Sequence, residues 1–516
     1  MCIAVKQSTK AKFIIIGSGF GGMMTAIRLR QIGETDIIIL ERDCDVGGVW
    51  RDNRYPGCAC DVESHLYSMS FAPNPNWSTV FAKQPEIYDY LKHCAQKFNL
   101  LQLIRFQHEV QRMDWDDTNG IWIIETTKGQ FRARMVIGAF GALSDPDIPR
   151  LKGMDKFKGQ AFHSANWPSN LDLKNKRVAV VGTGASAIQF IPEIQPQVAQ
   201  LHIFQRTPPW IIPRLDGPIS DTKKKLYRQV PLLQKANRLK FYLQREYMVI
   251  GFINPKMMNK TQEQALAHMH KDIKNPDLRQ KLKPNYTIGC KRILLSNNYY
   301  PALAKPNVDV NTNGIAEIEE HAVIDQKGSR IEVDMIIYGT GFKVTDTPLA
   351  RQIYGIDGRS LAQEWNGSPK AYLGTMVAGF PNLFILQGPN TGLGHSSVIF
   401  MMEAQIMHMQ KVIKHMRTKY YDVIQPTRKA QQRFVEEMSK AMQQTVWSLG
   451  GCKSWYIDQT GRNSTIWPSF TFTYRQLASK FKAEDYEGHL AGISPMNPTS
   501  LLHPAKEKMS KVEVFK

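Results

Sequence analysis

Two glycine-rich turns constrain the fold of this 516-residue chain more than any other feature of its sequence. Each turn stands between a short β-branched strand and a helical stretch, which is the pattern of a Rossmann-like unit. The pattern begins at residue 13 and again at residue 178. The sequence therefore predicts an α/β fold with two Rossmann-like dinucleotide-binding domains.

The first glycine turn, residues 17–22, has a separate task for each of its glycines. Gly17 permits the tight turn, Gly19 lets the backbone approach a pyrophosphate, and Gly22 lets the helix pack closely on the strand. The next predicted strand ends at Glu41, 19 residues after Gly22. A carboxylate there accepts hydrogen bonds from ribose hydroxyls and repels a 2′-phosphate, so this site favours FAD or NAD over NADP.

The residues after this acid favour FAD. The sequence GGVW brings Gly48 and Trp50 directly after the acidic strand, and RYPGCACDVES then brings Asp61. A glycine pair followed by an aromatic residue is typical of flavoproteins, which close this stretch over the flavin. We therefore expect these three residues at the FAD site. The alternative for Trp50 is an ordinary aromatic residue of the core.

The second glycine turn, residues 182–187, has alanine at its third position, which is an accepted variant. The strand after it ends in Arg206 and Thr207 instead of an acid. A guanidinium and a hydroxyl suit the 2′-phosphate of NADPH. The alternative for Arg206 is an ordinary surface arginine. The residues expected at the NADPH site are Gly182, Gly184, Ser186, Arg206 and Thr207.

The order of these patterns predicts a discontinuous first domain. Residues 332–342 (EVDMIIYGTGF) resemble a strand and turn that return the chain to the FAD sheet. We expect residues 1–145 and 331–496 to form the FAD-binding domain and residues 146–330 the NADPH-binding domain. A polar C-terminal tail is expected at residues 497–516.

A basic helical insert is expected at about residues 215–290. Between residues 221 and 290 the chain has 15 Lys and Arg against 5 Asp and Glu, which is half of its net charge of +20. Apolar residues recur there at helical spacing. The simplest interpretation is a solvated basic face. Attraction of an anionic cofactor and a membrane-surface or nucleic-acid role stay open.

Cysteine usage and hydropathy indicate the cytoplasm. No apolar run approaches the roughly 18 to 20 residues of a membrane span, and the basic start leads into a strand instead of a signal peptide. Seven scattered cysteines argue against a disulfide framework. Cys58 and Cys60 lack the spacing of a redox or zinc pair, so no metal site is expected.

The stretch FKGQAFHSANWP, residues 157–168, lies between the two glycine turns. It carries every fixed position of the signature F-x-G-x-x-x-H-x-x-x-W-[P/D], namely Phe157, Gly159, His163, Trp167 and Pro168. On these residues the chain resembles the Baeyer–Villiger monooxygenases, the FAD- and NADPH-dependent class. The resemblance extends over most of the chain and includes GTGASA, FQRTPPW, YGTGF, FPNLFILQGPNTGLGHSS and SWYIDQTGRNSTIWP.

The resemblance implies a catalytic Arg292, held by Asp61, and an NADPH phosphate bound by Arg206, Thr207 and Lys291. It implies that NADPH and O₂ are used to insert one oxygen next to a ketone carbonyl through a C4a-peroxyflavin, giving an ester or lactone. The expected partners are a small-molecule ketone and O₂, with no nucleic acid and no stable membrane span. Monomer and dimer both stay open.

Four other classes of protein are compatible with parts of the sequence. An N- or S-oxidising flavin monooxygenase shares both glycine turns, but the Trp167–Pro168 ending and Arg292 disfavour it. A two-nucleotide disulfide reductase needs a paired redox cysteine. A basic nucleic-acid-binding protein and a non-catalytic flavoprotein stay open. His163 is expected to be structural, whereas His395 is expected to face the flavin or to cap a loop.

Overall fold

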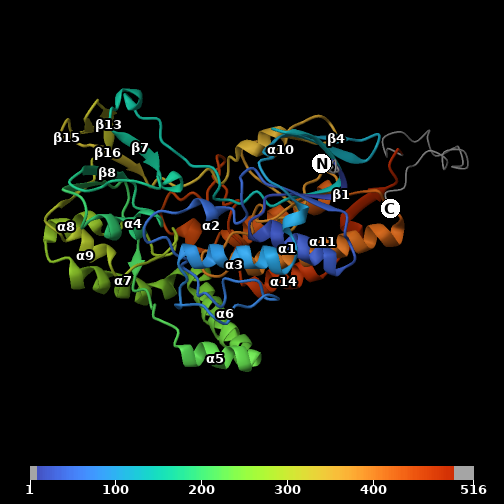
Figure 1. Cartoon of the computed structure of the whole chain (residues 1–516), viewed down its shortest axis with the longest axis horizontal. Coiled ribbons are helices and arrows are strands. Elements are labelled where there is room, and N and C mark those ends of the chain that lie inside the picture. Colours follow the sequence, from blue (N-terminus) through green and yellow to red (C-terminus); the bar gives the residue numbers. More distant parts are fainter. Residues whose placement is uncertain (1–8, 493–516) are drawn as a thin grey trace, which may run out of the picture.

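The computed structural model describes residues 9–492 and contains two units side by side, the first built on a mixed sheet and the second on a parallel one (Figure 1). The first unit has an eight-stranded sheet of order β17-β4-β5-β6-β1-β2-β3, with β18 beside β6. Its central strand β1 (Lys10–Ile16) pairs in parallel with β2 (Ile37–Leu40) and β6 (Gly129–Gly138). The other strands are β3 (Ile104–Arg105), β4 (Val110–Asp116), β5 (Ile121–Thr126), β17 (Ile353–Tyr354) and β18 (Leu383–Ile385).

Both faces of β1 are covered, which explains its continuous apolar run. Phe13 and Ile15 pack with the residues of α1 (Phe20–Gln31) and α11 (Val398–Lys419). Ile14 and Ile16 pack on the other face against β4 and β5. The glycine turn after β1 therefore stands at the edge of a rigid core.

The second unit has a five-stranded parallel sheet of order β12-β9-β8-β16-β7. Its strands are β7 (Gln160–His163), β8 (Arg177–Val181), β9 (Gln200–Phe204), β12 (Val308–Asn311) and β16 (Met335–Tyr338). One face packs on α4 (Ala187–Ile194) and α9 (Tyr299–Leu303). The other face packs on a three-stranded antiparallel sheet of β13 (Ile315–Ile318), β14 (Ala322–Asp325) and β15 (Arg330–Glu332).

The place of β16 corrects one expectation from the sequence. This strand does not return to the first sheet, because it pairs in parallel with β7 and β8 of the second. The turn after it packs on the second glycine turn, where a Cβ on Gly182 would lie 2.5 Å from the carbonyl oxygen of Gly339. A central strand is apolar on both faces in either sheet, so its sequence alone does not assign it. The boundary expected at residue 330 therefore lies near residue 340.

Two connecting segments cross between the units next to each other. Asp147 N donates to Gly341 O at 2.9 Å, and Lys343 N donates to Asp145 O at 2.9 Å. The outgoing segment, after β6, and the returning segment, after β16, are thus held together by backbone hydrogen bonds. Any relative movement of the two units has to pass through this pair of segments.

The expected insert is helical and consists mainly of α5 (Asp221–Gln229), α6 (Pro231–Ile253), α7 (Asn259–Asp272) and α8 (Pro276–Leu282). In Figure 1, α5 projects at the bottom of the molecule and α6 runs from it back to the body. No helix within residues 9–492 is long and apolar enough to cross a membrane. The tail expected at residues 497–516 lies outside the described residues.

The remaining elements lie outside the two large sheets. The α-helices are α2 (Val49–Asp52), α3 (Gln84–Lys97), α10 (Leu361–Trp365), α12 (Arg428–Met442), α13 (Val446–Leu449) and α14 (Thr471–Ser479). The strands are β10 (Ile211–Ile212), β11 (Leu294–Leu295), β19 (Val423–Pro426) and β20 (Tyr486–His489). The 3₁₀ turns are η1 (Leu101–Leu103), η2 (Met154–Lys156), η3 (Ser164–Asn166), η4 (Pro255–Met258), η5 (Pro348–Gln352) and η6 (Ala483–Asp485).

Candidate active site

The first glycine turn brings backbone to the N-terminus of α1. A Cβ on Gly17, whose φ is +99°, would lie 2.5 Å from the carbonyl oxygen of Ala139, and one on Gly22 would collide with the carbonyl oxygen of Gly17. Gly19 is the N-cap of α1, whose first turn has no side-chain cap and no acidic residue. The free N–H groups and the positive end of the helix therefore fit an anionic diphosphate.

A second glycine pair packs against this turn. Gly47 N donates to Ser18 O at 3.1 Å, and a Cβ on Gly48 would lie 3.4 Å from the Cα of Gly19. The two segments thus meet backbone to backbone, and Gly48 has a φ of +53°, which other residue types rarely adopt. The contact supports the expectation that Gly48 helps to enclose FAD, which stays a prediction.

Trp50 follows in α2 and is buried. Its indole Nε1 donates to the hydroxyl of Tyr67 at 3.1 Å, and the two rings meet edge-on with centroids 5.6 Å apart. These contacts are those of a core aromatic residue, the alternative that the sequence left open. A contact with the flavin stays a prediction.

Glu41 lies beside the first glycine turn, with its carboxylate fully engaged. One oxygen accepts from the N and Oγ of Ser18, at 2.9 and 2.6 Å. The other accepts from Asp43 N and from Arg51 Nη1, both at 3.0 Å. Burial alone would raise its pKa, but the Ser18 and Arg51 contacts lower it overall, so Glu41 stays ionised. Binding of ribose hydroxyls, which stays a prediction, requires one of these donors to move, since a carboxylate has about four acceptor positions.

The second glycine turn repeats the geometry of the first. Gly182 has a φ of +100° and packs on the turn after β16. The nearest atom to a Cβ on Gly184 would be 3.9 Å away, so the backbone is open on that side. Ser186 is the N-cap of α4, which has no side-chain cap and no acid in its first turn. This helix N-terminus therefore also fits a diphosphate.

Two cations stand together near the end of β9. Arg206 is exposed, and its charge, together with burial as the larger cause, lowers the pKa of Lys291. Within residues 9–492 neither cation forms an ion pair with an acidic side chain. Like charges brought together without an acid are stabilised by a bound anion. Arg206 and Lys291, with the neighbouring Thr207, therefore fit a phosphate group.

Asp61 and Arg292 form a two-pronged ion pair. Arg292 Nε donates to Asp61 Oδ2 and Arg292 Nη2 donates to Oδ1, both at 2.7 Å. The side chains are 27% and 28% exposed, so neither is fully enclosed by the protein. Burial alone would raise the pKa of Asp61, but Arg292 lowers it overall. The third nitrogen, Nη1, donates to Leu393 O at 3.3 Å. The pairing of these residues, expected from the family resemblance, is present.

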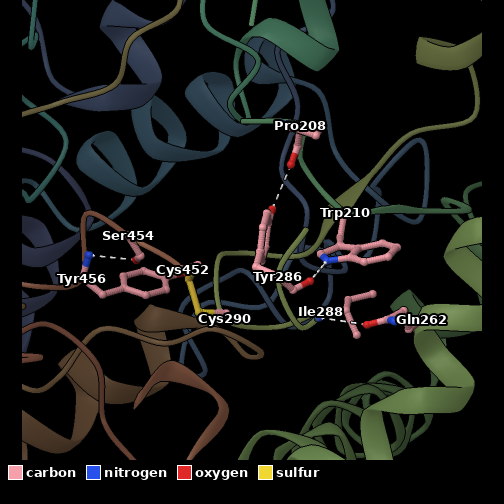
Figure 2. Close-up of a disulfide and its surroundings, with 9 residues drawn as sticks. All are labelled: Pro208, Trp210, Gln262, Tyr286, Ile288, Cys290, Cys452, Ser454 and Tyr456. Carbon is pink, nitrogen blue, oxygen red and sulfur yellow. Dashed lines mark hydrogen bonds between the residues drawn. A yellow bond between two sulfur atoms is a disulfide. The ribbon is translucent and has the colours of Figure 1, made fainter. Parts of the chain in front are cut away.

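The loop before Arg292 is fixed from several directions (Figure 2). Trp210 Nε1 donates to Tyr286 O at 2.8 Å, and Tyr286 Oη donates to Pro208 O at 3.1 Å. Ile288 N lies 3.5 Å from the side-chain oxygen of Gln262, in α7. The backbone that carries Arg292 is therefore held both to the second unit and to the helical insert.

The same loop carries a disulfide, which the sequence analysis did not expect. Cys290, two residues before Arg292, is bonded to Cys452 with their Cα atoms 6.1 Å apart (Figure 2). The scattered cysteines argued against a disulfide framework, and this single bond was not anticipated from the sequence. The two residues are 162 positions apart in the sequence, so only the folded chain reveals that they meet.

Replacing Cys452 with serine is expected to lower the melting temperature of the protein. The disulfide closes a long loop, and such cross-links contribute typically about 2 to 4 kcal/mol. Thermal unfolding of Cys452→Ser would be compared with that of Cys44→Ser, which removes an exposed free cysteine. Equal melting temperatures of the two variants would show that the cross-link adds no stability.

Helix α6 brings a further ion pair to the site. Arg245 donates to both carboxylate oxygens of Glu63, at 2.9 and 3.1 Å, and to Asp61 O at 3.0 Å. The backbone of the Asp61 segment is therefore held by a residue of the helical insert. Sequence reasoning missed this contact, because it assigned the insert a solvated basic face.

The next residue of the same helix, Glu246, is buried and faces another part of the chain. Its carboxylate accepts from the N and Oγ1 of Thr471, at 2.8 and 2.7 Å, and lies 3.4 Å from Nε2 of His395. Burial lowers the pKa of His395, although Glu246 opposes the shift. His395 thus contacts the insert, a position that neither alternative for it had named. The one feature of the sequence that could have indicated this contact is Glu246 itself, the single acid in a helix whose other charged residues are basic.

The signature stretch forms the edge of the second sheet. A Cβ on Gly159 would lie too close to Asp334 O for any other residue to fit. His163 ends β7, is buried, and its ring meets Phe342 of the returning segment edge-on, with centroids 5.3 Å apart. Burial lowers the pKa of His163, so the ring is neutral. Its contacts are structural, as expected, and Trp167 packs on Phe162 close by.

No group of three or more His, Cys, Asp and Glu side chains that could hold a metal ion occurs within residues 9–492.

Comparisons with known proteins agree with this geometry. The family model described as flavin-binding monooxygenase-like matches residues 10–354. A Baeyer–Villiger monooxygenase of Pseudomonas aeruginosa is 48% identical over 478 residues, which are 92% of this chain and 91% of that protein. The closed crystal structure of a cyclohexanone monooxygenase has a TM-score of 0.84 at 27% identity, and the match covers 94% of this chain and 100% of that one. OTEMO, crystallised with FAD and NADP, has a TM-score of 0.83 at 27% identity, over 93% of this chain and 100% of its own. The chain therefore belongs to the flavin-binding monooxygenase-like family and, within it, to the Baeyer–Villiger monooxygenases.

Proposed function

We propose that this chain uses NADPH and O₂ to insert one oxygen atom next to the carbonyl of a small-molecule ketone, giving an ester or a lactone. The observation that carries the proposal is the Asp61–Arg292 pair, a partly exposed arginine side chain whose guanidinium is held in one orientation. Bound FAD supplies the activation of O₂, and NADPH supplies the hydride. The chain itself binds and orients these groups and places a fixed charge beside them.

Arg292 supplies the permanent positive charge of the site. A guanidinium does not lose its proton near neutral pH, so it stabilises negative charge that develops on oxygen during the reaction. Asp61 fixes the direction of that charge through two hydrogen bonds. Arg245, donating to Asp61 O, holds the segment in turn. Asp61 and Arg292 are thus assigned to the chemistry and Arg245 to positioning.

The two glycine turns hold the two cofactors. FAD is assigned to the first turn, and its residues are Gly17, Gly19, Gly22, Glu41, Gly48, Trp50 and Asp61. NADPH is assigned to the second turn, and its residues are Gly182, Gly184, Ser186, Arg206, Thr207 and Lys291. The two uncapped helix N-termini and the unpaired cations support this division. It corresponds to an FAD domain of residues 9–145 and about 340–492, with the NADPH domain between them.

A panel of substrates tests the proposed reaction. The purified protein would be given NADPH, O₂ and cyclic, linear and aryl ketones, and the products identified by mass. An ester or lactone 16 mass units heavier than the ketone is expected. Sulfoxides or N-oxides from sulfides and amines, with no ester from any ketone, would favour the N- or S-oxidising alternative. Oxidation of NADPH without any oxygenated product would favour a non-catalytic flavoprotein.

Replacing His163 with alanine is expected to lower the yield of ester per NADPH consumed. Its ring packs on Phe342 between the two crossing segments, so its loss loosens the coupling between the units. Ester and H₂O₂ formed per NADPH would be measured together with the FAD content. His163→Gln, which keeps a buried polar side chain, is the matched variant. An unchanged ratio of ester to H₂O₂ in His163→Ala would contradict this role.

We propose the cytoplasm as the compartment, because the proposed reaction consumes NADPH and the cytoplasm supplies it. The Cys290–Cys452 disulfide argues the other way, because disulfides are rare in cytosolic proteins. Trapping free thiols in intact cells with an alkylating reagent distinguishes a reducing compartment from an oxidising one. Alkylation of both cysteines would support a reducing compartment, and protection of both would contradict it.

A further inference from the structure

Helix α6 carries an apolar stripe that faces away from the protein body. Leu232, Leu239, Leu243 and Tyr247 are 72%, 54%, 57% and 70% exposed. At 3.6 residues per turn these four side chains fall within about 80° of arc. Large apolar side chains gathered on one exposed face mark an interaction surface more often than chance exposure.

The opposite face of α6 is anchored, so the stripe does not result from a loosely placed helix. Gln234 is buried and donates to Asn74 O at 2.7 Å, and Arg238 donates to His65 O at 2.7 Å. Arg245 is paired with Glu63. The stripe is therefore exposed along a fixed helix, which runs from the projecting α5 back to the protein body (Figure 1).

Exposed cations flank the stripe. On the helical wheel Lys235 and Lys240 lie at its two edges, and Lys225 and Arg228 are exposed on the adjoining α5. Within residues 9–492 none of these four forms an ion pair. Among the acids of α5 and α6, Asp221 already pairs with Lys224, and Glu246 is buried. The surface thus combines apolar side chains with unneutralised positive charge.

We propose that the apolar stripe of α6 and the cations of α5 and α6 dock the protein on an anionic lipid surface. Leucines on one face with lysines at its edges match a membrane whose acyl chains are apolar and whose headgroups are negative. A second copy of this chain fits less well, because a symmetric contact would oppose the lysines to their own counterparts. Nucleic acid complements the cations but would not bury the four exposed apolar side chains.

Vesicle flotation of the full chain with FAD bound tests the proposal. The protein is expected to float with vesicles of phosphatidylcholine and phosphatidylglycerol, to remain behind with phosphatidylcholine alone, and to be released by salt. Leu239→Ser/Leu243→Ser is expected to lower the binding constant by about tenfold or more. Lys235→Gln/Lys240→Gln is expected to lower it about fivefold for each lysine removed.

Matched controls separate docking from general stickiness. Leu101→Ser/Leu490→Ser removes two leucines that are 45% and 47% exposed elsewhere, and it should bind vesicles as the parent protein does. FAD absorbance and circular dichroism establish that each variant is folded. Because binding is the readout, failure here is distinguishable from failure of the proposed oxygenation.

Four results would overturn the proposal. They are absence of binding to anionic vesicles, equal binding to neutral ones, a dimer in lipid-free solution that the leucine variant dissociates, and retention on DNA that the lysines govern but the leucines do not. The third result would identify a second copy as the occupant. The fourth would identify nucleic acid.

Discussion

Replacing Arg292 with alanine is expected to abolish ester formation while FAD stays bound and is still reduced by NADPH. Neither glycine turn contains Arg292, so we expect FAD to remain bound without it. Removal of one preorganised donor at a developing negative charge costs about 10²- to 10³-fold in rate. NADPH consumed by the variant should appear as H₂O₂, measured beside the ester in the same reaction.

Two further variants sharpen the interpretation. Arg292→Lys keeps the charge but not the two-pronged contact, so it should retain part of the activity. Asp61→Asn keeps the cation but loses its charged partner, and should show an intermediate loss with FAD still bound. Ester at the parent rate from Arg292→Ala would remove Arg292 from the chemistry. Loss of FAD from that variant would show that its role is structural.

The parts of the site that sequence anticipated are those defined by local backbone requirements. Gly17 and Gly182 both have a φ near +100° and both pack against a carbonyl oxygen, which no other residue type tolerates. Such demands appear in the sequence as fixed glycines. The Asp61–Arg292 pair was anticipated differently, through the family resemblance, because nothing local indicates that residues 231 positions apart will meet.

The parts that sequence missed depend on tertiary neighbours. The apolar run of β16 fits either parallel sheet, and only its pairing with β7 and β8 decides. Cys290 and Cys452 look like unrelated thiols until the fold brings them together. The helical spacing of apolar residues in α6 could be read from the sequence, but the sequence did not indicate which face of the helix would pack on the protein. The side chains of Arg245 and Glu246 contact other parts of the protein, whereas the apolar stripe is exposed.

The two glycine turns are alike in backbone geometry but differ in the charge beside them. Both place an uncapped helix N-terminus beside a tight turn, so both suit a diphosphate. The strand ends differ, because Glu41 is buried and negative whereas Arg206 is exposed and positive. We therefore expect these two residues to contribute to the choice between FAD and NADPH, and this difference can be tested directly.

Arg206→Ala and Lys291→Ala are each expected to weaken the use of NADPH and to spare that of NADH. The two cofactors differ by the 2′-phosphate, and a hydrogen bond to a charged group contributes about 1.5 to 3 kcal/mol. That range corresponds to a loss of about 10- to 150-fold in kcat/KM for NADPH. The loss should lie in KM, because the phosphate is remote from the transferred hydride.

The matched variants test charge rather than size. Arg206→Lys keeps a cation without the fork and should lose less than Arg206→Ala. Lys291→Gln keeps most of the side chain without its charge, and should lose about as much as Lys291→Ala. Rates of flavin reduction by NADPH and NADH, measured without ketone, report on this step alone. If the single variants impaired both cofactors equally, the cations would be holding the fold of the loop and not a phosphate.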